Sequence, residues 1–125
     1  LGRESFLKGE ISWDADNIKT VLVDLADYTA NLSTDQFLSD IAAGGRVATS
    51  ANLASKTTTL GSADAADVTF SSVTGDVSEA LVIYQDTGSA GTSRLIAYID
   101  TATGLPVTPN GGDIQVQWSA PILTL

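Results

Sequence analysis

Three side chains near the N-terminus have types and spacing that suit a metal site. Asp14, Asp16 and Asn17 are spaced like the first ligands of a calcium-binding loop. An EF-hand loop that begins at Asp14 needs glycine at its sixth position and glutamate at its twelfth, where this chain has Lys19 and Leu25. The EF-hand pattern therefore fails. The favoured interpretation is an acidic turn whose carboxylates accept backbone N–H bonds, with weak cation binding at Asp14 and Asp16 as the alternative.

Two pairs of carboxylates have the spacing to serve as a general acid and base. Asp64 lies close to Asp67 in the sequence, and Asp76 lies close to Glu79. A glycosidase needs two such groups on either side of a cleft, one of them with a raised pKa. Each pair falls in a predicted polar turn, so we expect solvated turn carboxylates.

Nucleophilic chemistry has few candidates, because the sequence contains no His and no Cys. A serine nucleophile would need a lysine base, and Lys8, Lys19 and Lys56 do not lie in a helical Ser-x-x-Lys pattern. We therefore predict no enzymatic activity, no catalytic, cofactor-binding or metal-ligating residues, and no cofactor.

Four aromatic side chains could form a sugar-binding platform if they were exposed: Trp13, Trp118, Tyr84 and Tyr98. Trp118 alternates with apolar neighbours in a predicted strand, which favours a place in the core. Trp13, beside Asp14, is the aromatic residue that we consider for a contact with a partner.

Composition limits the partners. The chain of 125 residues carries 15 acidic against 6 basic residues, a formal net charge of -9. Such a charge repels phosphate backbones and anionic lipid, so we expect no binding to nucleic acid or membranes. The longest apolar stretch, residues 21–26, is interrupted by Asp24 and is too short to span a bilayer. The length suits a single domain over residues 1–125.

Short strands separated by regular turn residues predict the fold class. Period-two alternation or continuous apolar runs mark strands at residues 18–25, 68–73, 81–85, 95–99, 113–118 and 122–125, and residues 57–59 could form an edge strand. At 18–25 the alternation predicts a strand covered on one side, with Val21, Val23 and Leu25 facing inward. We therefore expect a mainly β protein, an antiparallel β-sandwich of jelly-roll or Ig-like type with one short α-helix. The expected core includes Val23, Phe70, Leu81, Ile83 and Trp118.

Two segments fall outside this strand pattern. Ser33 and Gln36 form a capping-box pattern before an apolar stripe, which predicts the helix at residues 34–42. Residues 1–13 lack clean alternation, although residues 6–13 suggest a strand or hairpin around Lys8. We expect residues 1–13 to be an N-terminal arm that lies across a neighbouring subunit or a capsid surface, or else an ordinary first strand.

The order of these segments resembles a family of small virion structural proteins of tailed bacteriophages. The resemblance covers nearly the whole chain and rests on the segments FLKG (6–9), IKTVLVD (18–24), FLSDI (37–41), EALVIYQDTG (79–88), LIAYID (95–100), GGDIQVQW (111–118) and IL (122–123). These are strand and turn segments without a catalytic signature.

The resemblance implies a non-enzymatic assembly protein located in the virion, which assembles in the bacterial host cytoplasm. Within that class, a capsid decoration (cement) protein that stabilises the head lattice is the leading expectation. Its partners would be the major capsid protein or other virion proteins, and it would form a homo-oligomer such as a trimer. The alternative is a tail, neck or fibre component, or a carbohydrate- or receptor-binding module of the virion.

Overall fold

The computed structural model describes residues 3–29, 31, 34–118 and 121–124. Strands dominate the described chain, and all of the named strand pairs are antiparallel. No helix in this described part is long and apolar enough to cross a membrane. In chain order the elements are α1 (Arg3–Leu7), β1 (Ile18–Val23), η1 (Leu38–Asp40), η2 (Ala43–Gly45), β2 (Arg46–Thr49), β3 (Thr57–Thr59), β4 (Ser62–Asp64), β5 (Val68–Phe70), β6 (Ala80–Gln85), β7 (Leu95–Ile99), β8 (Ile114–Val116) and β9 (Leu123–Thr124).

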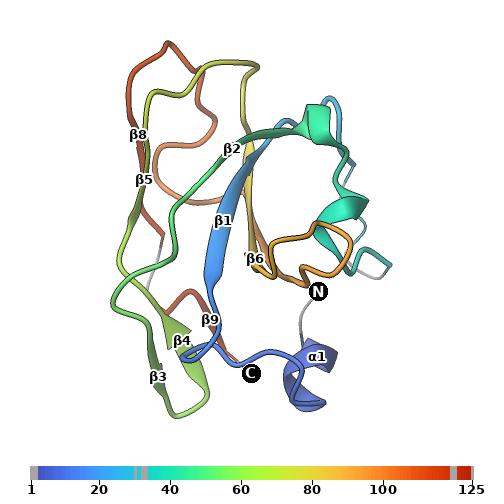
Figure 1. Ribbon diagram of the computed structural model, residues 1–125. Coiled ribbons are helices and arrows are strands. Elements are labelled where there is room, and N and C mark those ends of the chain that lie inside the picture. Colours follow the sequence, from blue (N-terminus) through green and yellow to red (C-terminus); the bar gives the residue numbers. More distant parts are fainter. Residues whose placement is uncertain (1–2, 30, 32–33, 119–120, 125) are drawn as a thin grey trace.

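The largest sheet has the order β2-β1-β6-β7 and forms the centre of the molecule (Figure 1). Its two inner strands, β1 and β6, are buried on both faces, which explains the apolar run in β6. The prediction that β1 is covered on one side is therefore wrong, because Thr20 and Leu22 are as fully buried as Val21 and Val23.

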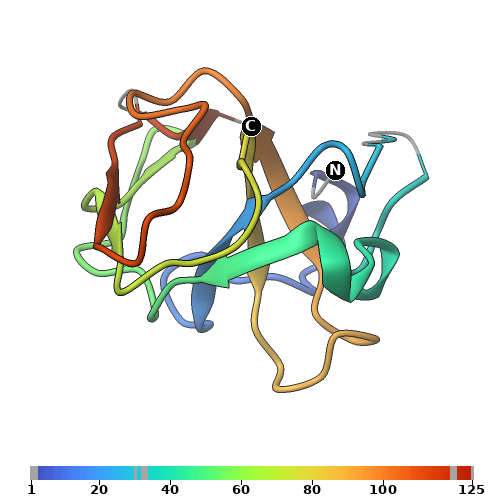
Figure 2. The same cartoon turned by 90° about the horizontal axis from the view of Figure 1, so that it is seen from above.

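Each face of the central sheet packs against a different layer. Ile18, Leu22, Leu81 and Ile83 point into the larger core, which also contains residues of β5, β8 and both tryptophans. On the opposite face, Val21, Val23, Val82 and Tyr84 pack against Tyr28, Leu38 and Ile41 from the segment before β2. Figure 2 shows this separation, with the red β8 on one side of the central strands and the turquoise segment on the other.

The predicted fold class is confirmed as mainly β and antiparallel, with a sandwich-like arrangement and a short α-helix. A three-stranded sheet of order β3-β4-β9 and a two-stranded sheet of β5 and β8 face the central sheet. The five expected core residues, Val23, Phe70, Leu81, Ile83 and Trp118, are all buried. The edge strand at residues 57–59 is also confirmed as β3, whose three residues are exposed.

The prediction of an α-helix at residues 34–42 is wrong. A short 3-10 turn, η1, lies within this range, and a second, η2, follows it. The backbone N–H groups of Leu38 and Ser39 donate to the carbonyl oxygens of Ser93 and Ala90, at 2.8 and 3.0 Å, instead of to the preceding turn. Tertiary hydrogen bonds thus override the local helical pattern. The proposed cap at Ser33 lies outside the described residues.

The N-terminal segment forms α1 and a loop with two buried side chains, so the prediction of a strand or hairpin there is wrong. Gly9 follows α1 with a φ of +75°, a left-handed conformation that suits glycine at the end of a helix. Ile11 and Trp13 are buried in the larger core of the same chain, with 5% and 4% of their surface exposed. Most of the surface of these two side chains is therefore packed within their own chain, whereas the arm expectation has residues 1–13 lie across a neighbouring subunit or a capsid surface.

Candidate functional site

The acidic loop after α1 is held by hydrogen bonds within the fold. One carboxylate oxygen of Asp16 accepts the backbone N–H of Ser12 at 2.8 Å and the side-chain amide of Gln85 at 2.6 Å. Asp14 accepts the hydroxyl of Thr58 at 2.9 Å. The two carboxylates thus have different partners, which supports the interpretation as an acidic turn.

The two predicted carboxylate pairs also contact the backbone. Asp64 accepts the N–H of Ala65 at 2.9 Å, whereas Asp67 is exposed. Glu79 accepts the N–H of Leu25 at 2.9 Å and thereby joins the start of β6 to the end of β1. Carboxylates in turns commonly accept backbone N–H bonds of this kind, so the contacts of Asp64 and Glu79 agree with turn positions.

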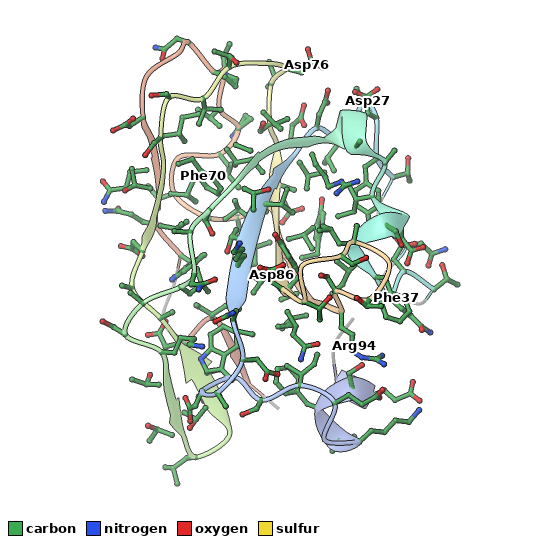
Figure 3. All side chains as sticks on the ribbon, in the orientation of Figure 1. Asp27, Phe37, Phe70, Asp76, Asp86 and Arg94 are labelled. Atoms are coloured by element: carbon green, nitrogen blue, oxygen red, sulfur yellow. The ribbon has the colours of Figure 1, made fainter. Side chains whose placement is uncertain are left out.

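An acidic cluster that the sequence analysis missed consists of Asp24, Asp27 and Asp76, whose carboxylate oxygens lie within 4.8 Å of one another. Figure 3 shows Asp27 and Asp76 at the end of the molecule opposite α1. The negative charge of Asp24 raises the pKa of Asp27, with burial and a hydrogen bond to Asp24 adding to the effect. The antiparallel pairing of β1 with β6 brings Asp24 near Asp76, and no local spacing reveals this proximity.

The lysines are engaged in contacts that oppose a role as a general base. Lys19 forms an ion pair of 3.0 Å with Asp86, and Lys8 pairs with Glu4. The hydrogen bond to its carboxylate partner raises the pKa of each ammonium group, whereas a catalytic base needs a lowered pKa. The ammonium group of Lys56 donates to the carbonyl oxygen of Asp16.

The four aromatic residues do not form an exposed platform. Trp13, Trp118 and Tyr84 expose 4%, 8% and 3% of their surface, and Tyr98 is half-buried. The prediction that Trp118 belongs to the core is confirmed. Stacking of a sugar ring would need an open aromatic face, which Trp13, Trp118 and Tyr84 do not offer.

A cavity of about 230 Å³ opens between α1 and the β3–β4 hairpin. Phe6 of α1 lines one side, Trp13 and Asp14 come from the following loop, and Thr58 and Ala63 come from the hairpin. Trp13 thus lines this cavity although most of its surface is buried. The sequence singled out Trp13 and Asp14, but the contribution of α1 and of the hairpin depends on tertiary contacts.

Two large apolar side chains next in sequence to lining residues of this cavity are exposed. Leu7, at the end of α1, is 84% exposed, and Leu60, at the tip of the β3–β4 hairpin, is 99% exposed. Both elements lie at the lower end of the molecule in Figure 1. We call this end, with Leu7, Leu60 and the cavity between their elements, the hairpin end.

The conformation of Leu60 is unusual for its residue type. Leu60 and Gly61 join β3 to β4 with φ angles of +51° and +81°. Asparagine followed by glycine is the preferred pair in such a two-residue hairpin, because a leucine is strained at positive φ. An exposed and strained leucine gains nothing for folding at this position, so its side chain is a candidate contact for a partner.

Comparisons with known proteins give no family assignment. No model of a known protein family matches the sequence, and a search of curated proteins finds no match.

Proposed function

We propose that the protein is a non-enzymatic structural protein of a tailed-bacteriophage virion, a capsid decoration protein that binds the head lattice through its hairpin end. The observation that carries this proposal is the exposure of Leu7 and Leu60 on α1 and the β3–β4 hairpin, the two elements that border a mainly apolar cavity at one end of the fold. Exposed apolar groups gathered at one site are typical of protein–protein contact surfaces.

The resemblance of the strand and turn segments to small virion proteins supports the identity of the partner. The contacts of the candidate catalytic groups support a role without chemistry, because Asp64 and Glu79 accept backbone N–H groups and the candidate lysine Lys19 is paired with Asp86. The formal charge of -9 favours solubility before assembly and opposes adsorption to released nucleic acid.

Attachment as a homo-oligomer fits the small size of the contact surface. Several weak contacts on one lattice together give high avidity, so each hairpin end would need to supply only part of the interface. A trimer at a local threefold axis of the head would supply such contacts. Sedimentation of the protein alone and bound to heads would measure this state.

A binding experiment with isolated heads tests the proposal. Heads from a phage that lacks this coding sequence are incubated with purified protein, and bound protein is measured after sedimentation. We expect saturable binding to heads. Binding to tails or to host cells instead of heads would contradict a decoration role and support a tail, fibre or receptor-binding role.

Three substitutions test the surface. Leu60→Asp should weaken binding to heads by roughly tenfold or more, as expected for a central apolar contact, and Leu7→Ser should also weaken it. Val77 is the matched control because it is 41% exposed and follows Asp76 at the opposite end. Val77→Ser should bind as the wild type does. Equal binding of Leu60→Asp and the wild type would contradict the proposed surface.

A further inference from the structure

The cavity at the hairpin end combines apolar walls with one charged group at its rim. Phe6, Trp13 and Ala63 supply apolar surface, and Asp14 supplies a carboxylate. Asp14 is exposed, and its described contact is the hydroxyl of Thr58. Among the ion pairs of the described chain, none includes Asp14.

Among the described residues, no basic side chain lines the cavity, and four of the basic side chains have partners elsewhere. Lys8, Lys19 and Arg94 form ion pairs with Glu4, Asp86 and Glu10, respectively. The ammonium group of Lys56 donates to a backbone carbonyl. The negative charge at the cavity rim is therefore left for a group from outside, and the formal charge of -9 attracts cationic groups to the whole molecule.

We propose that this cavity binds a lysine or arginine side chain of a partner protein. Long basic side chains bury their aliphatic stem on apolar surface and keep the charged head near a carboxylate. Here the stem would lie between Phe6 and Trp13, and the cationic head would reach Asp14.

Neutral occupants fit the cavity less well. A neutral apolar side chain would leave the Asp14 carboxylate without a counter-charge beside a newly buried surface. A sugar would need the open face of an aromatic ring, whereas Trp13 is 4% exposed. Charge complementarity therefore favours a basic side chain.

The proposed function enters this inference only through the identity of the partner, a virion protein. A test with small probes is independent of it. The chain contains two tryptophans, so a ¹⁵N-labelled sample gives two indole N–H signals in an NMR spectrum. Trp13 reports on the cavity, and Trp118, whose indole donates to Ala65 away from the cavity lining, is the internal control.

The probes are n-butylammonium chloride, which mimics a lysine side chain, and 1-butanol, which has a similar stem without the charge. Sodium chloride keeps the ionic strength equal. We expect n-butylammonium to shift the Trp13 signal saturably and to leave Trp118 in place, and we expect 1-butanol to bind at least threefold more weakly, on the order of the effect of one exposed ion pair. Added salt should weaken binding of n-butylammonium and leave 1-butanol unchanged.

Two variants complete the test. Asp14→Asn keeps an acceptor for Thr58 and removes the charge, so it should weaken n-butylammonium binding roughly three- to fivefold and leave 1-butanol unaffected. Asp67→Asn removes an exposed charge outside the cavity and should bind both probes as the wild type does. The proposal is overturned if n-butylammonium leaves the Trp13 signal unshifted, if both probes bind equally, if Asp14→Asn has no effect, or if only a neutral monosaccharide shifts Trp13.

The result of the probe experiment can be distinguished from the result of the head-binding experiment that tests the proposed function. If n-butylammonium binds as expected and the protein fails to bind heads, the cavity assignment stands and the virion role falls. If heads bind the protein but n-butylammonium leaves the Trp13 signal unshifted, the virion role stands and the cavity assignment falls.

Discussion

The indole N–H groups of Trp13 and Trp118 donate to the carbonyl oxygens of two consecutive residues, Asp64 and Ala65, both at 3.1 Å. Trp13 belongs to the loop after α1, and Trp118 follows β8. The end of β4 thus receives one tryptophan from each terminal part of the chain. Because both rings are buried, each bond satisfies a polar N–H that would otherwise be costly within the core.

Removal of the Trp118 side chain should strongly destabilise the protein. Trp118→Ala leaves a cavity in the larger core and leaves the carbonyl of Ala65 without this donor, so we expect a loss of about 3 to 5 kcal/mol in the free energy of unfolding. Urea denaturation followed by circular dichroism measures the change. A loss below about 1 kcal/mol would contradict the buried position of this ring.

Replacement of Leu60 should raise the stability of the protein and weaken its binding to phage heads. Leu60→Asn relieves a leucine held at a φ of +51°, so we expect the free energy of unfolding to rise by roughly 0.5 to 1 kcal/mol. The same variant should bind phage heads more weakly, because it removes an apolar contact. Urea denaturation and the sedimentation assay together test this. A variant that is more stable and binds unchanged would show that Leu60 has no part in docking.

Asp40 should stabilise the protein at neutral pH and less in acid. Its carboxylate accepts the backbone N–H groups of Gln36 and Phe37, at 2.8 and 3.0 Å, and these bonds lower its pKa in the folded state. A lowered pKa gives stability that is present above the ordinary pKa of a carboxyl group and is lost as the pH falls through the folded-state pKa. Asp40→Ala should therefore cost about 1 kcal/mol at pH 7, and the difference from the wild type should narrow in acid. Asp67→Ala, which removes an exposed carboxylate, is the control, and a constant difference at all pH values would contradict the assignment.

Asp27 should show the opposite dependence on pH. The charge of Asp24 raises the pKa of Asp27, so the folded protein binds this proton more tightly than the unfolded chain does. The resulting repulsion is absent below the ordinary pKa of a carboxyl group and grows as the pH rises through the folded-state pKa. We expect Asp27→Asn to have a higher melting temperature than the wild type at pH 7 and the same one near pH 3. A lower melting temperature at pH 7 would show that the Asp27 charge is stabilising.

The sequence predicts those parts of the fold in which local pattern and burial agree. The alternation around Val116 and the apolar run of β6 both follow from positions that the sheet buries. The helical pattern at residues 34–42 misleads because Leu38 and Ser39 bond to the loop at residues 90–93, which a local pattern does not contain.

The candidate site was predictable only in part. Trp13 and Asp14 stand out by residue type, but their cavity also needs Phe6 from α1 and Thr58 from the hairpin. The strain at Leu60 depends on its φ angle, and leucine is not the residue that marks such turns in a sequence.

The central claim is the proposed place on a phage head, and cryo-electron microscopy of intact virions, from a phage whose genome contains this coding sequence, tests it most directly. The account predicts density for this fold on the outside of the head, in repeated copies, with α1 and the β3–β4 hairpin turned toward the shell. Density for the fold in the tail or fibres, its absence from the particle, or copies on the head with the hairpin end turned toward solvent would contradict it.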